Sequence, residues 1–238
     1  MSKSISVLGI IPARGGSKGI RKKNIYKLCG EPLINYTIEA AKSSRFLTRT
    51  IVSTDSEEIA EIARAAGAEV PFLRPAKLAS DKSPTIDTII HSLNWLKENK
   101  NEQYDYVMVL QPTSPLRTSI DIDESIKKAQ ETGADSIMSM VELSDMSLKK
   151  LKKIQEDQIF PLLEEEGKSP APRTSHTATY TRNAAIYLTK ASVILKGDVF
   201  GNVSRPYIMP FERSVDINDM KDMALSEFFL KKMKDGNN

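Results

Sequence analysis

Residues 10–19 read Ile-Ile-Pro-Ala-Arg-Gly-Gly-Ser-Lys-Gly, and Lys22-Lys23-Asn24 follow two residues later. This stretch places a glycine-rich, basic loop directly after a short apolar strand, which is where α/β proteins bind nucleotide phosphates. Glycine lets the backbone approach a ligand closely, and Arg14, Lys18 and Lys23 supply positive charge for a polyanion. The stretch predicts an α/β fold with a triphosphate site near the N-terminus.

Two common phosphate motifs do not describe this loop. A P-loop requires Gly-x-x-x-x-Gly-Lys followed by Ser or Thr, whereas this chain has Gly16-Ser17-Lys18-Gly19. A dinucleotide fingerprint requires Gly-x-Gly-x-x-Gly at a tight strand-to-helix turn, and that spacing is also missing. From the residues alone, a solvated basic turn remains the alternative.

Composition indicates one globular domain over residues 1–238. The chain is 40% hydrophobic and 27% charged, and 34 Lys and Arg residues against 31 Asp and Glu give a net charge of +3, too small to suggest nucleic acid as a partner. The single cysteine, Cys29, excludes an internal disulfide and is interpreted as a small packing residue. With no signal peptide or membrane span predicted, we expect a cytoplasmic protein that does not bind a membrane.

Apolar runs of strand length alternate with helical periodicity through the first part of the chain, which predicts a doubly wound, mostly parallel sheet. Strands are predicted at residues 6–11, 50–53, 69–72, 106–110 and 136–141, and again at 183–188, with further short elements at 193–197 and 207–209. Helices are predicted at residues 32–43, from a cap at Asp55 to Gly67, at 84–98 with Trp95 on its apolar side, and at 218–233. The inward side chains of the last helix are expected to be Met220, Met223, Ala224, Phe228 and Phe229.

The segment 142–182 interrupts the alternation, because it is polar and shows no βα pattern. A segment of this length without its own pattern in a compact domain usually forms a lid, a hairpin arm or an oligomerisation element. We therefore expect an inserted unit here.

Three further segments follow predicted strands and should meet the first loop at the carboxyl edge of the sheet. The first is Arg74 to Thr85, which contains a cation, hydroxyls and a helix start. The second is the loop Leu110-Gln111-Pro112-Thr113-Ser114-Pro115-Leu116-Arg117, which two prolines make rigid. The third is Ser214 to Asp219.

In the third of these segments, Asp216 and Asn218 alternate along an extended chain and would point to one side, as paired oxygen ligands for Mg²⁺ require. Asp219 would point the other way. The alternative is that Asn218 or Asp216 only caps the last helix, although cap and metal roles can coexist.

Other reactive groups are sparse. His91 lies inside a predicted helix and His176 in the inserted segment, with no zinc pattern and no serine nucleophile elbow. We interpret both histidines as structural or surface residues. The residues therefore favour an electrostatic, metal-assisted mechanism over a covalent one.

Taken together, the strings at residues 11–24, 51–55, 74–81, 110–117 and 214–218 resemble the acylneuraminate (sialic acid) cytidylyltransferase family. The order and spacing agree over essentially the whole chain. The resemblance implies a nucleotide-diphosphosugar-transferase-like fold, a homodimer in which the inserted segment 142–182 is a dimerisation and sugar-binding arm, and CTP with Mg²⁺ as partners. It also implies transfer of CMP to the anomeric hydroxyl of a nonulosonic acid with release of pyrophosphate, a step in making cell-surface polysaccharides.

The same resemblance assigns the site residues. The nucleotide would be held by Arg14, Gly15, Gly16, Ser17, Lys18, Lys23, Asn24, Arg74, Ser80 and Thr85. The sugar would be held by Gln111, Lys149, Arg173 and Tyr187, and the metal by Asp216 and Asn218. Arg14, Lys23 and Asp216 would act in catalysis.

The chain departs from the family pattern at three positions: Asn218 replaces a second metal-binding aspartate, Ala184 replaces a glycine, and Thr181 replaces an arginine, with Arg182 one place along. The acceptor is therefore left open among sialic, legionaminic and pseudaminic acids. An octulosonate ranks lower because Gln111 stands in a string where an acidic residue would be expected. A small phosphorylated acid and a non-catalytic nucleotide sensor are further alternatives.

Overall fold

The fold is built on a six-stranded sheet. The computed structural model describes residues 4–17, 19–80, 83–143, 151–162 and 178–235. The strands lie in the order β10-β6-β9-β5-β1-β4, with bounds β1 (Val7–Pro12), β4 (Arg49–Ser53), β5 (Tyr106–Val109), β6 (Ser136–Glu142), β9 (Tyr180–Lys190) and β10 (Ser204–Ile208). Strand β9 runs antiparallel to β5 and β6, and the other pairs are parallel. The predicted mostly parallel sheet is confirmed.

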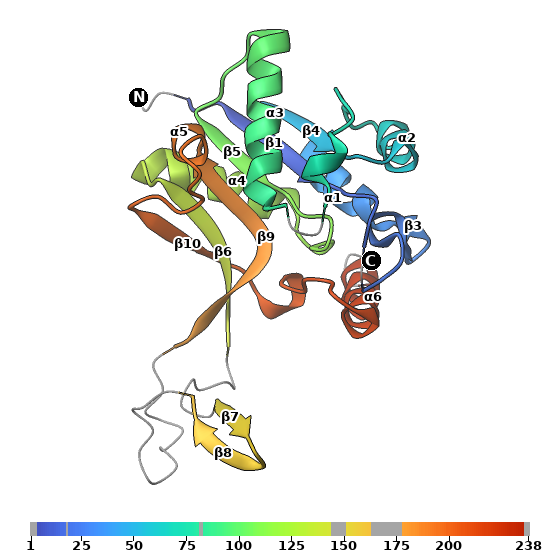
Figure 1. Cartoon of the computed structure of the whole chain (residues 1–238), viewed down its shortest axis with the longest axis vertical. Coiled ribbons are helices and arrows are strands. Elements are labelled where there is room, and N and C mark those ends of the chain that lie inside the picture. Colours follow the sequence, from blue (N-terminus) through green and yellow to red (C-terminus); the bar gives the residue numbers. More distant parts are fainter. Residues whose placement is uncertain (1–3, 18, 81–82, 144–150, 163–177, 236–238) are drawn as a thin grey trace.

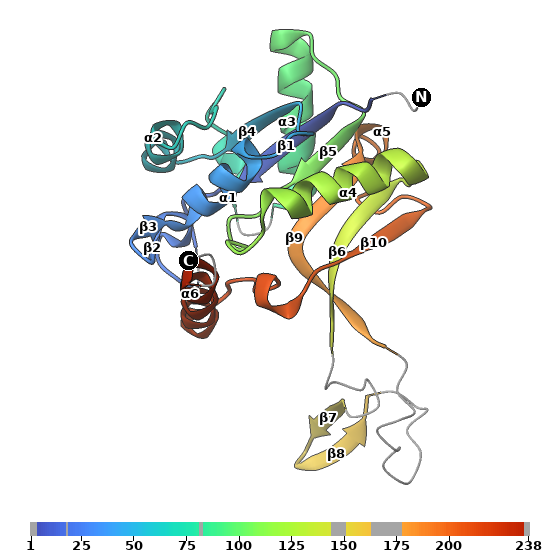
Figure 2. The ribbon, with the colours of Figure 1, turned by 180° about the vertical axis from the view of Figure 1, so that it is seen from behind.

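Helices cover both faces of this sheet, as Figures 1 and 2 show from opposite sides. The helices are α1 (Leu33–Lys42), α2 (Glu57–Ala65), α3 (Thr85–Lys100), α4 (Ser119–Thr132), α5 (Ala191–Ile194) and α6 (Met220–Asp235). Successive residues of a strand point to opposite faces, so Val7 and Ile11 of β1 pack in the core with α1 and α4, while Leu8 and Ile10 pack in the core with α3 and α5. Both faces of β1 are therefore buried, as the continuous apolar run predicts.

A third apolar cluster fastens the C-terminal helix beside the first loop. Met223, Phe229 and Leu230 of α6 pack with Ile20 and with the short hairpin of β2 (Lys27–Leu28) and β3 (Glu31–Pro32). Cys29 occupies the turn of this hairpin and packs at the edge of the cluster, as expected for a packing residue. The loop after β1 is thereby held against the segment that precedes α6.

Several element predictions need correction. Residues 69–72 form no strand and contribute one isolated bridge, Glu69 with Ile51, because Pro71 in the middle of the run cannot donate a ladder hydrogen bond. Ser56 caps α2 in place of Asp55. In α6, Met223 and Phe229 are buried, but Met220, Ala224 and Phe228 are exposed.

Helix α4 was missing from the expected elements, although its boundaries have sequence signals. Thr118 and Asp121 form a reciprocal capping box at its start, and Gly133 closes it with φ 61°. Trp95 of α3 packs on Phe72 with ring centroids 5.0 Å apart, as expected for a core residue.

The inserted segment is shorter than the predicted 142–182, because Glu142 ends β6 and residues 180–182 begin β9, so both pair in the main sheet. Within the insert, the structure describes a two-stranded hairpin. Strand β7 (Lys152–Gln155) pairs antiparallel with β8 (Gln158–Pro161), and Figure 1 shows them beyond the ends of β6 and β9, away from the helical layers. The hairpin exposes Ile154 and Ile159, which lie directly opposite each other and are 75% and 71% exposed. Lys149, Arg173 and His176 lie outside the described residues.

No helix in the described residues is long and apolar enough to cross a membrane.

Candidate active site

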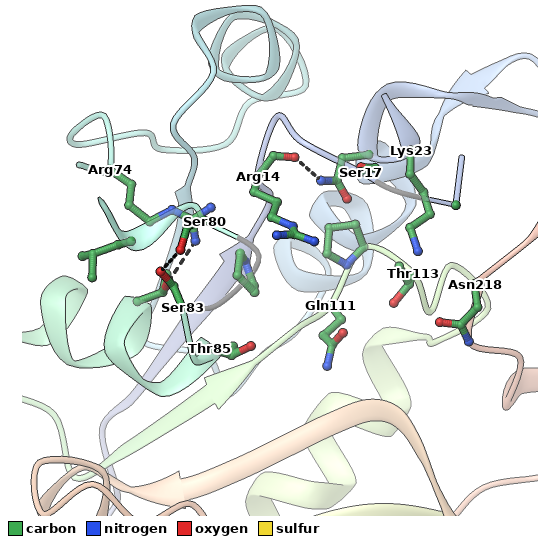
Figure 3. Close-up of a pocket in the computed structure, with 16 residues that line it drawn as sticks. Arg14, Ser17, Lys23, Arg74, Ser80, Ser83, Thr85, Gln111, Thr113 and Asn218 are labelled. Carbon is green, nitrogen blue, oxygen red and sulfur yellow. Dashed lines mark hydrogen bonds between the residues drawn. The ribbon is translucent and has the colours of Figure 1, made fainter. Parts of the chain in front are cut away.

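The predicted segments meet in one cavity of about 490 Å³, shown in Figure 3. It opens beyond the ends of β1 and β5, where open α/β sheets collect their ligands. In that view Arg14 lies in the middle, between Arg74 with Ser80 on one side and Lys23 with Asn218 on the other. The predicted site residues that line the cavity are Arg14, Ser17, Lys23, Asn24, Arg74, Ser80, Thr85, Gln111 and Asn218.

Two side chains, Asn24 and Asp55, fix the loop after β1 by hydrogen bonds to its backbone. The side-chain amide of Asn24 is buried and donates to the carbonyl of Arg14 at 2.8 Å, so Asn24 shapes the loop as well as lining the cavity. The backbone N–H of Gly15 donates to Asp55 at 2.9 Å. A Cβ on Gly16 would meet nothing within 4 Å, and Lys18 lies outside the described residues.

Lys23 connects this loop to the segment before α6. Its ammonium donates to the carbonyl of Ile217 at 2.8 Å. Burial lowers the pKa of the Lys23 ammonium, and the carboxylates of Asp216 and Asp222 oppose that effect. Lys23 therefore faces the acidic segment as well as the cavity.

The segment around Asp216 is extended, as its alternating pattern predicts. Val215 and Ile217 are buried in the third apolar cluster, so Asp216 and Asn218 face the other way. The backbone N–H of Ile217 donates to the carbonyl of Thr113 at 2.8 Å, which fastens the segment to the loop after β5. Asp216 is half-buried.

Neither Asp216 nor Asn218 caps α6. That role falls to Asp219, whose carboxylate accepts from the N–H groups of Lys221 and Asp222 at 2.7 and 3.2 Å, while Asp222 accepts from the N–H of Asp219. The Asn218 amide nitrogen donates to the carbonyl of Asp216 at 3.1 Å, and in Figure 3 its amide oxygen faces Thr113. The alternative that Asn218 or Asp216 is only a helix cap is wrong.

On the far side of the cavity, Arg74 is almost completely buried. Its Nη1 donates to Thr88 at 2.9 Å and its Nη2 lies 3.5 Å from a carboxylate oxygen of Asp55. Nε and Nη2 have no hydrogen-bond acceptor among the described residues. Burial lowers the pKa of Arg74 and Asp55 opposes that effect. Buried donors of this kind require an acceptor, which water or a bound ligand can supply.

Beside Arg74, two serine hydroxyls close one wall of the cavity. Ser80 and Ser83 lie 2.8 Å apart, and Ser83 donates to the carbonyl of Lys77. Thr113, in the predicted polar loop after β5, lines the cavity, and so do Ser83 and Thr88, which were not among the predicted site residues. Small hydroxyl side chains carry little sequence signal by themselves, so they become visible only when the loops are brought together.

A second, smaller cavity of about 210 Å³ adjoins the first and shares Thr85 and Gln111 with it. Tyr187 lines it, so the predicted sugar-binding pair Gln111 and Tyr187 lies in one place. Most of its remaining wall is apolar, from residues that sequence reasoning did not assign to a site: Ile86, Ile89, Val107, Val109, Ile194 and Val199.

Arg182 lines this smaller cavity and lies over the ring of Phe200, 5.3 Å from its centroid. Burial raises the pKa of Tyr187, and the positive charge of Arg182 opposes it. Between these two residues β9 contains a bulge in which Ala184 has φ 61°, a left-handed conformation that favours glycine. The alanine at this position therefore carries backbone strain.

Gln111 is held in place by a fully buried cation. Arg117 donates to the carbonyls of Gln111 and Ala185 at 3.3 and 2.9 Å and to the hydroxyl of Thr37 at 2.7 Å. It thus joins the loop after β5 to β9 and α1, and links the wall shared by the two cavities to the strand that carries Tyr187.

His91 lines neither cavity and packs edge-on against Phe72 with ring centroids 4.9 Å apart. Burial lowers its pKa. The structural interpretation of this histidine is confirmed.

Three comparisons with known proteins agree. A family model described as cytidylyltransferase matches residues 8–225. The chain is 35% identical to a CMP-N,N'-diacetyllegionaminic acid synthase from Legionella pneumophila, over 93% of this chain and 94% of that protein. It is 33% identical to post-translational flagellin modification protein B from Campylobacter coli, over 94% and 95%. It is 35% identical to an N-acylneuraminate cytidylyltransferase from Escherichia coli, over 92% of this chain and 51% of that longer protein.

Two solved structures share the fold at low sequence identity. A CMP:2-keto-3-deoxy-manno-octonic acid synthetase complexed with CTP superimposes with a TM-score of 0.70 at 14% identity, over 96% of this chain and 99% of that one. A 4-diphosphocytidyl-2C-methyl-D-erythritol synthase gives 0.66 at 12%, over 95% and 99%. The cation-lined cavity at the carboxyl edge of the sheet and the match of the family model over nearly the whole chain lead to one conclusion: the chain belongs to the cytidylyltransferase family of nucleotidyltransferase enzymes.

Proposed function

We propose that this enzyme transfers CMP from CTP to the anomeric hydroxyl of a nonulosonic acid and releases pyrophosphate. The observation that carries the proposal is the pair of adjoining cavities, one lined by Arg14, Lys23 and Arg74 and the other mostly apolar, which share Thr85 and Gln111. A nucleotide in the first and an acylated sugar in the second would meet at this shared wall.

The first cavity suits CTP. Arg14, Ser17 and Lys23 would contact the triphosphate, and the buried Arg74 would face the base. Arg74 lines this cavity and its guanidinium only donates hydrogen bonds, so it complements a base edge that carries only acceptors, as O2 and N3 of cytosine do, whereas N3 of uracil carries a hydrogen. Binding of uracil would leave donors of Arg74 unpaired, and unpaired buried groups discriminate between ligands more strongly than a difference in size does.

The donor set around Asp216 fits Mg²⁺. The ion is usually held by one or two carboxylates together with substrate phosphates and water, and here the half-buried Asp216 and the amide oxygen of Asn218 lie on one side of an extended chain beside the triphosphate cavity. When bound, Mg²⁺ would screen the phosphate charge and favour ionisation of the attacking hydroxyl.

The chain's own residues would position the reactants. The anomeric oxygen attacks the α-phosphorus, and the new P–O bond forms as the bond between the α-phosphorus and the α,β-bridging oxygen of CTP breaks. Pyrophosphate leaves with that oxygen, and the hydroxyl proton passes to solvent. Arg14 and Lys23 would stabilise the charge that develops on the departing pyrophosphate, and Gln111 would orient the sugar at the shared wall. We propose catalysis by positioning and charge, without a dedicated histidine base.

The acceptor is proposed to be an acylated nonulosonic acid, in agreement with the names of the relatives. An apolar cavity of this size suits the methyl of an acylamido group better than a bare polyol. An octulosonate acceptor is less well supported, because Gln111 carries an amide where an octulosonate enzyme is expected to carry an acidic side chain. Lys149 and Arg173 remain proposed contacts to the sugar.

We also propose that the protein is a cytoplasmic homodimer. The hairpin of β7 and β8 is too small to be stable by itself and exposes Ile154 and Ile159, so its apolar face needs a partner. A second copy of the chain would supply one and would bring the inserted segment to the site of the other subunit.

The test is pyrophosphate release by the purified protein with CTP and Mg²⁺, run with N-acetylneuraminate, legionaminate, pseudaminate and 3-deoxy-octulosonate, and with ATP, GTP and UTP as nucleotide controls. Release only with CTP and a nonulosonate would support the proposal and name the sugar. Turnover with the octulosonate alone would mean that the acceptor is an octulosonate and not a nonulosonate. Tight CTP binding without release from any acceptor would favour a nucleotide sensor.

A further inference from the structure

We propose that Asp55 is a positioning residue that ties the phosphate-binding loop to the base-side arginine, so that recognition of the base and of the triphosphate are coupled through one carboxylate. The inference rests on the proposed function, because it assigns the base to Arg74 and the triphosphate to the loop after β1. Asp55 is not among the residues that line either cavity, so it would act through others.

The two contacts converge on a single oxygen atom. Oδ1 of Asp55 accepts from the backbone N–H of Gly15 at 2.9 Å and lies 3.5 Å from Nη2 of Arg74. The side chain of Arg74 is only 4% exposed and that of Asp55 is 25% exposed. A charge pair with one almost completely buried partner is less screened than a surface pair, so its loss would affect both residues.

Backbone hydrogen bonds place Asp55 between the two loops. Just before it, the carbonyl of Ser53 accepts from the N–H of Ala13 at 3.0 Å, and the carbonyl of Thr54 accepts from the N–H of Arg74 at 2.7 Å. The end of β4 is therefore flanked by the phosphate loop on one side and by the base-side segment on the other. Asp55 is the first side chain beyond this junction that can contact both.

The local structure keeps the Asp55 carboxylate available for this role. Ser56 caps α2 by accepting a hydrogen bond from the N–H of Ile59, so Asp55 is not needed as the helix cap. A Cβ on Gly15 would lie 3.1 Å from Cβ of Ser56, so the glycine allows the loop to approach the end of β4 closely.

The charge of Asp55 matters more to Arg74 than to Gly15. A neutral amide oxygen can still accept from the Gly15 N–H, but it cannot balance a buried guanidinium. Burial lowers the pKa of Arg74, and Asp55 is the first of the groups that oppose it. Asp55→Asn should therefore separate the two contacts, whereas Asp55→Ala should remove both.

The test compares Asp55→Asn and Asp55→Ala with Ser56→Ala, a neighbouring change that removes the helix cap but neither contact. Calorimetry measures binding of CTP and of inorganic tripolyphosphate, which has no base. We expect Asp55→Asn to weaken CTP by at least tenfold and tripolyphosphate by less than threefold, and Asp55→Ala to weaken both by at least tenfold. Ser56→Ala should lower the melting temperature with little change in either affinity.

A double-mutant cycle with Arg74→Met supplies a readout that a general loss of stability would not move. If Asp55 acts through Arg74, Asp55→Asn in the Arg74→Met background should change CTP affinity by less than threefold. The inference would be overturned if Asp55→Asn reduced the affinities for CTP and tripolyphosphate equally. It would also be overturned if Asp55→Asn reduced CTP affinity as much in the Arg74→Met background as in the wild type.

These binding assays use no acceptor, so they separate the inference from the proposed function. Wild-type protein that shows the expected binding pattern but releases no pyrophosphate with any sugar would retain the coupling and lose the proposed reaction. Wild-type protein that binds neither CTP nor tripolyphosphate would overturn both.

Discussion

The ammonium of Lys23 lies 2.8 Å from the carbonyl oxygen of Ile217, the residue between the two proposed metal ligands. This hydrogen bond links the phosphate-binding loop directly to the segment that carries Asp216. A triphosphate that draws the ammonium toward itself would compete with that carbonyl. Nucleotide binding and the position of Asp216 are therefore expected to depend on each other.

Lys23→Met should reduce kcat/KM for CTP by about 10- to 100-fold, the equivalent of one hydrogen bond to a charged group, worth about 1.5–3 kcal/mol. The matched control is Lys22→Met, because Lys22 is next in the chain but its ammonium pairs with Glu58 at 2.7 Å on the surface. Steady-state kinetics of both variants make the comparison. Equal losses in the two would mean that only the net charge of the loop matters.

Gly19→Ala should impair turnover, because the added Cβ would lie 2.6 Å from the backbone carbonyl oxygen of Asn218. Backbone cannot yield as a flexible side chain can, so the segment or the loop must shift, at a cost of about 1–3 kcal/mol. In Gly16→Ala, in the same loop, the added Cβ meets nothing within 4 Å, so this variant is the control for thermal unfolding. Thermal unfolding of Gly19→Ala and Gly16→Ala, and pyrophosphate release by Gly19→Ala, test this prediction. Full activity in Gly19→Ala would contradict the close contact.

Asn218→Asp should raise the affinity for Mg²⁺ on the order of tenfold, because a second carboxylate adds a full charge beside a divalent ion. Asp216→Ala should abolish turnover while the protein stays folded. Titration of activity with Mg²⁺, and of CTP-bound protein with Mn²⁺ as a spectroscopic probe, measures both. An unchanged metal dependence in Asn218→Asp would remove position 218 from the metal site.

The pairing of Asp121 with Arg213 predicts a pH dependence of stability. Burial of Asp121 opposes ionisation, but hydrogen bonds from Arg213 and Thr118 outweigh it and hold the pKa of the carboxyl below its usual value. A carboxyl whose pKa is lower in the folded state stabilises the fold above its unfolded pKa of about 3.9, and this contribution is lost as the pH falls through the folded value.

Asp121→Asn should therefore lower the free energy of unfolding by about 2 kcal/mol at pH 7, less than for a fully buried pair because Arg213 is partly exposed. The difference from wild type should hold down to about pH 5 and shrink below pH 4. Urea unfolding across this range tests it, with Glu61→Gln on the exposed face of α2 as a control. A difference that persists unchanged at pH 2 would contradict the assignment to ionised Asp121.

Charges on the exposed face of the hairpin should dissociate the proposed dimer. Ile154 and Ile159 share one face, so Ile154→Asp with Ile159→Asp places two like charges there. Light scattering should show half the wild-type mass. Gln155→Asp with Gln158→Asp makes the same change on the opposite face and should leave the mass unchanged. A monomeric wild-type protein would contradict the proposal directly.

Sequence patterns predicted most of the fold because the central strands are buried on both faces. The continuous apolar runs of β1 and β5 and the amphipathic helices between them follow from that burial. The prediction of a strand at residues 69–72 was wrong because it gave the apolar residues more weight than Pro71. Helix α4 was not predicted, although Thr118 and Gly133 mark its ends. Local pattern carries no information on which runs find a partner strand.

The candidate site was predictable where chemistry is concentrated in one segment. Arg14, Lys23 and Gln111 stand in distinctive strings and do line the first cavity. The role of Asp55 was misjudged, because its spacing before a helix suggests a cap, and only the folded chain brings Gly15 and Arg74 to its carboxylate. Likewise, the apolar wall of Ile86 and Val199 looks like ordinary core until the elements around it leave a space.

The two cavities share Thr85 and Gln111, whereas Ile194 and Val199 line the smaller one without lining the larger. Under the proposed function, acceptor choice is a separable trait of this scaffold: substitutions at such positions would change which sugar is activated while the residues proposed to bind the nucleotide stay intact. An enzyme divided in this way is a practical starting point for engineering, because libraries confined to a few apolar positions would explore new acceptors at little risk to the chemistry.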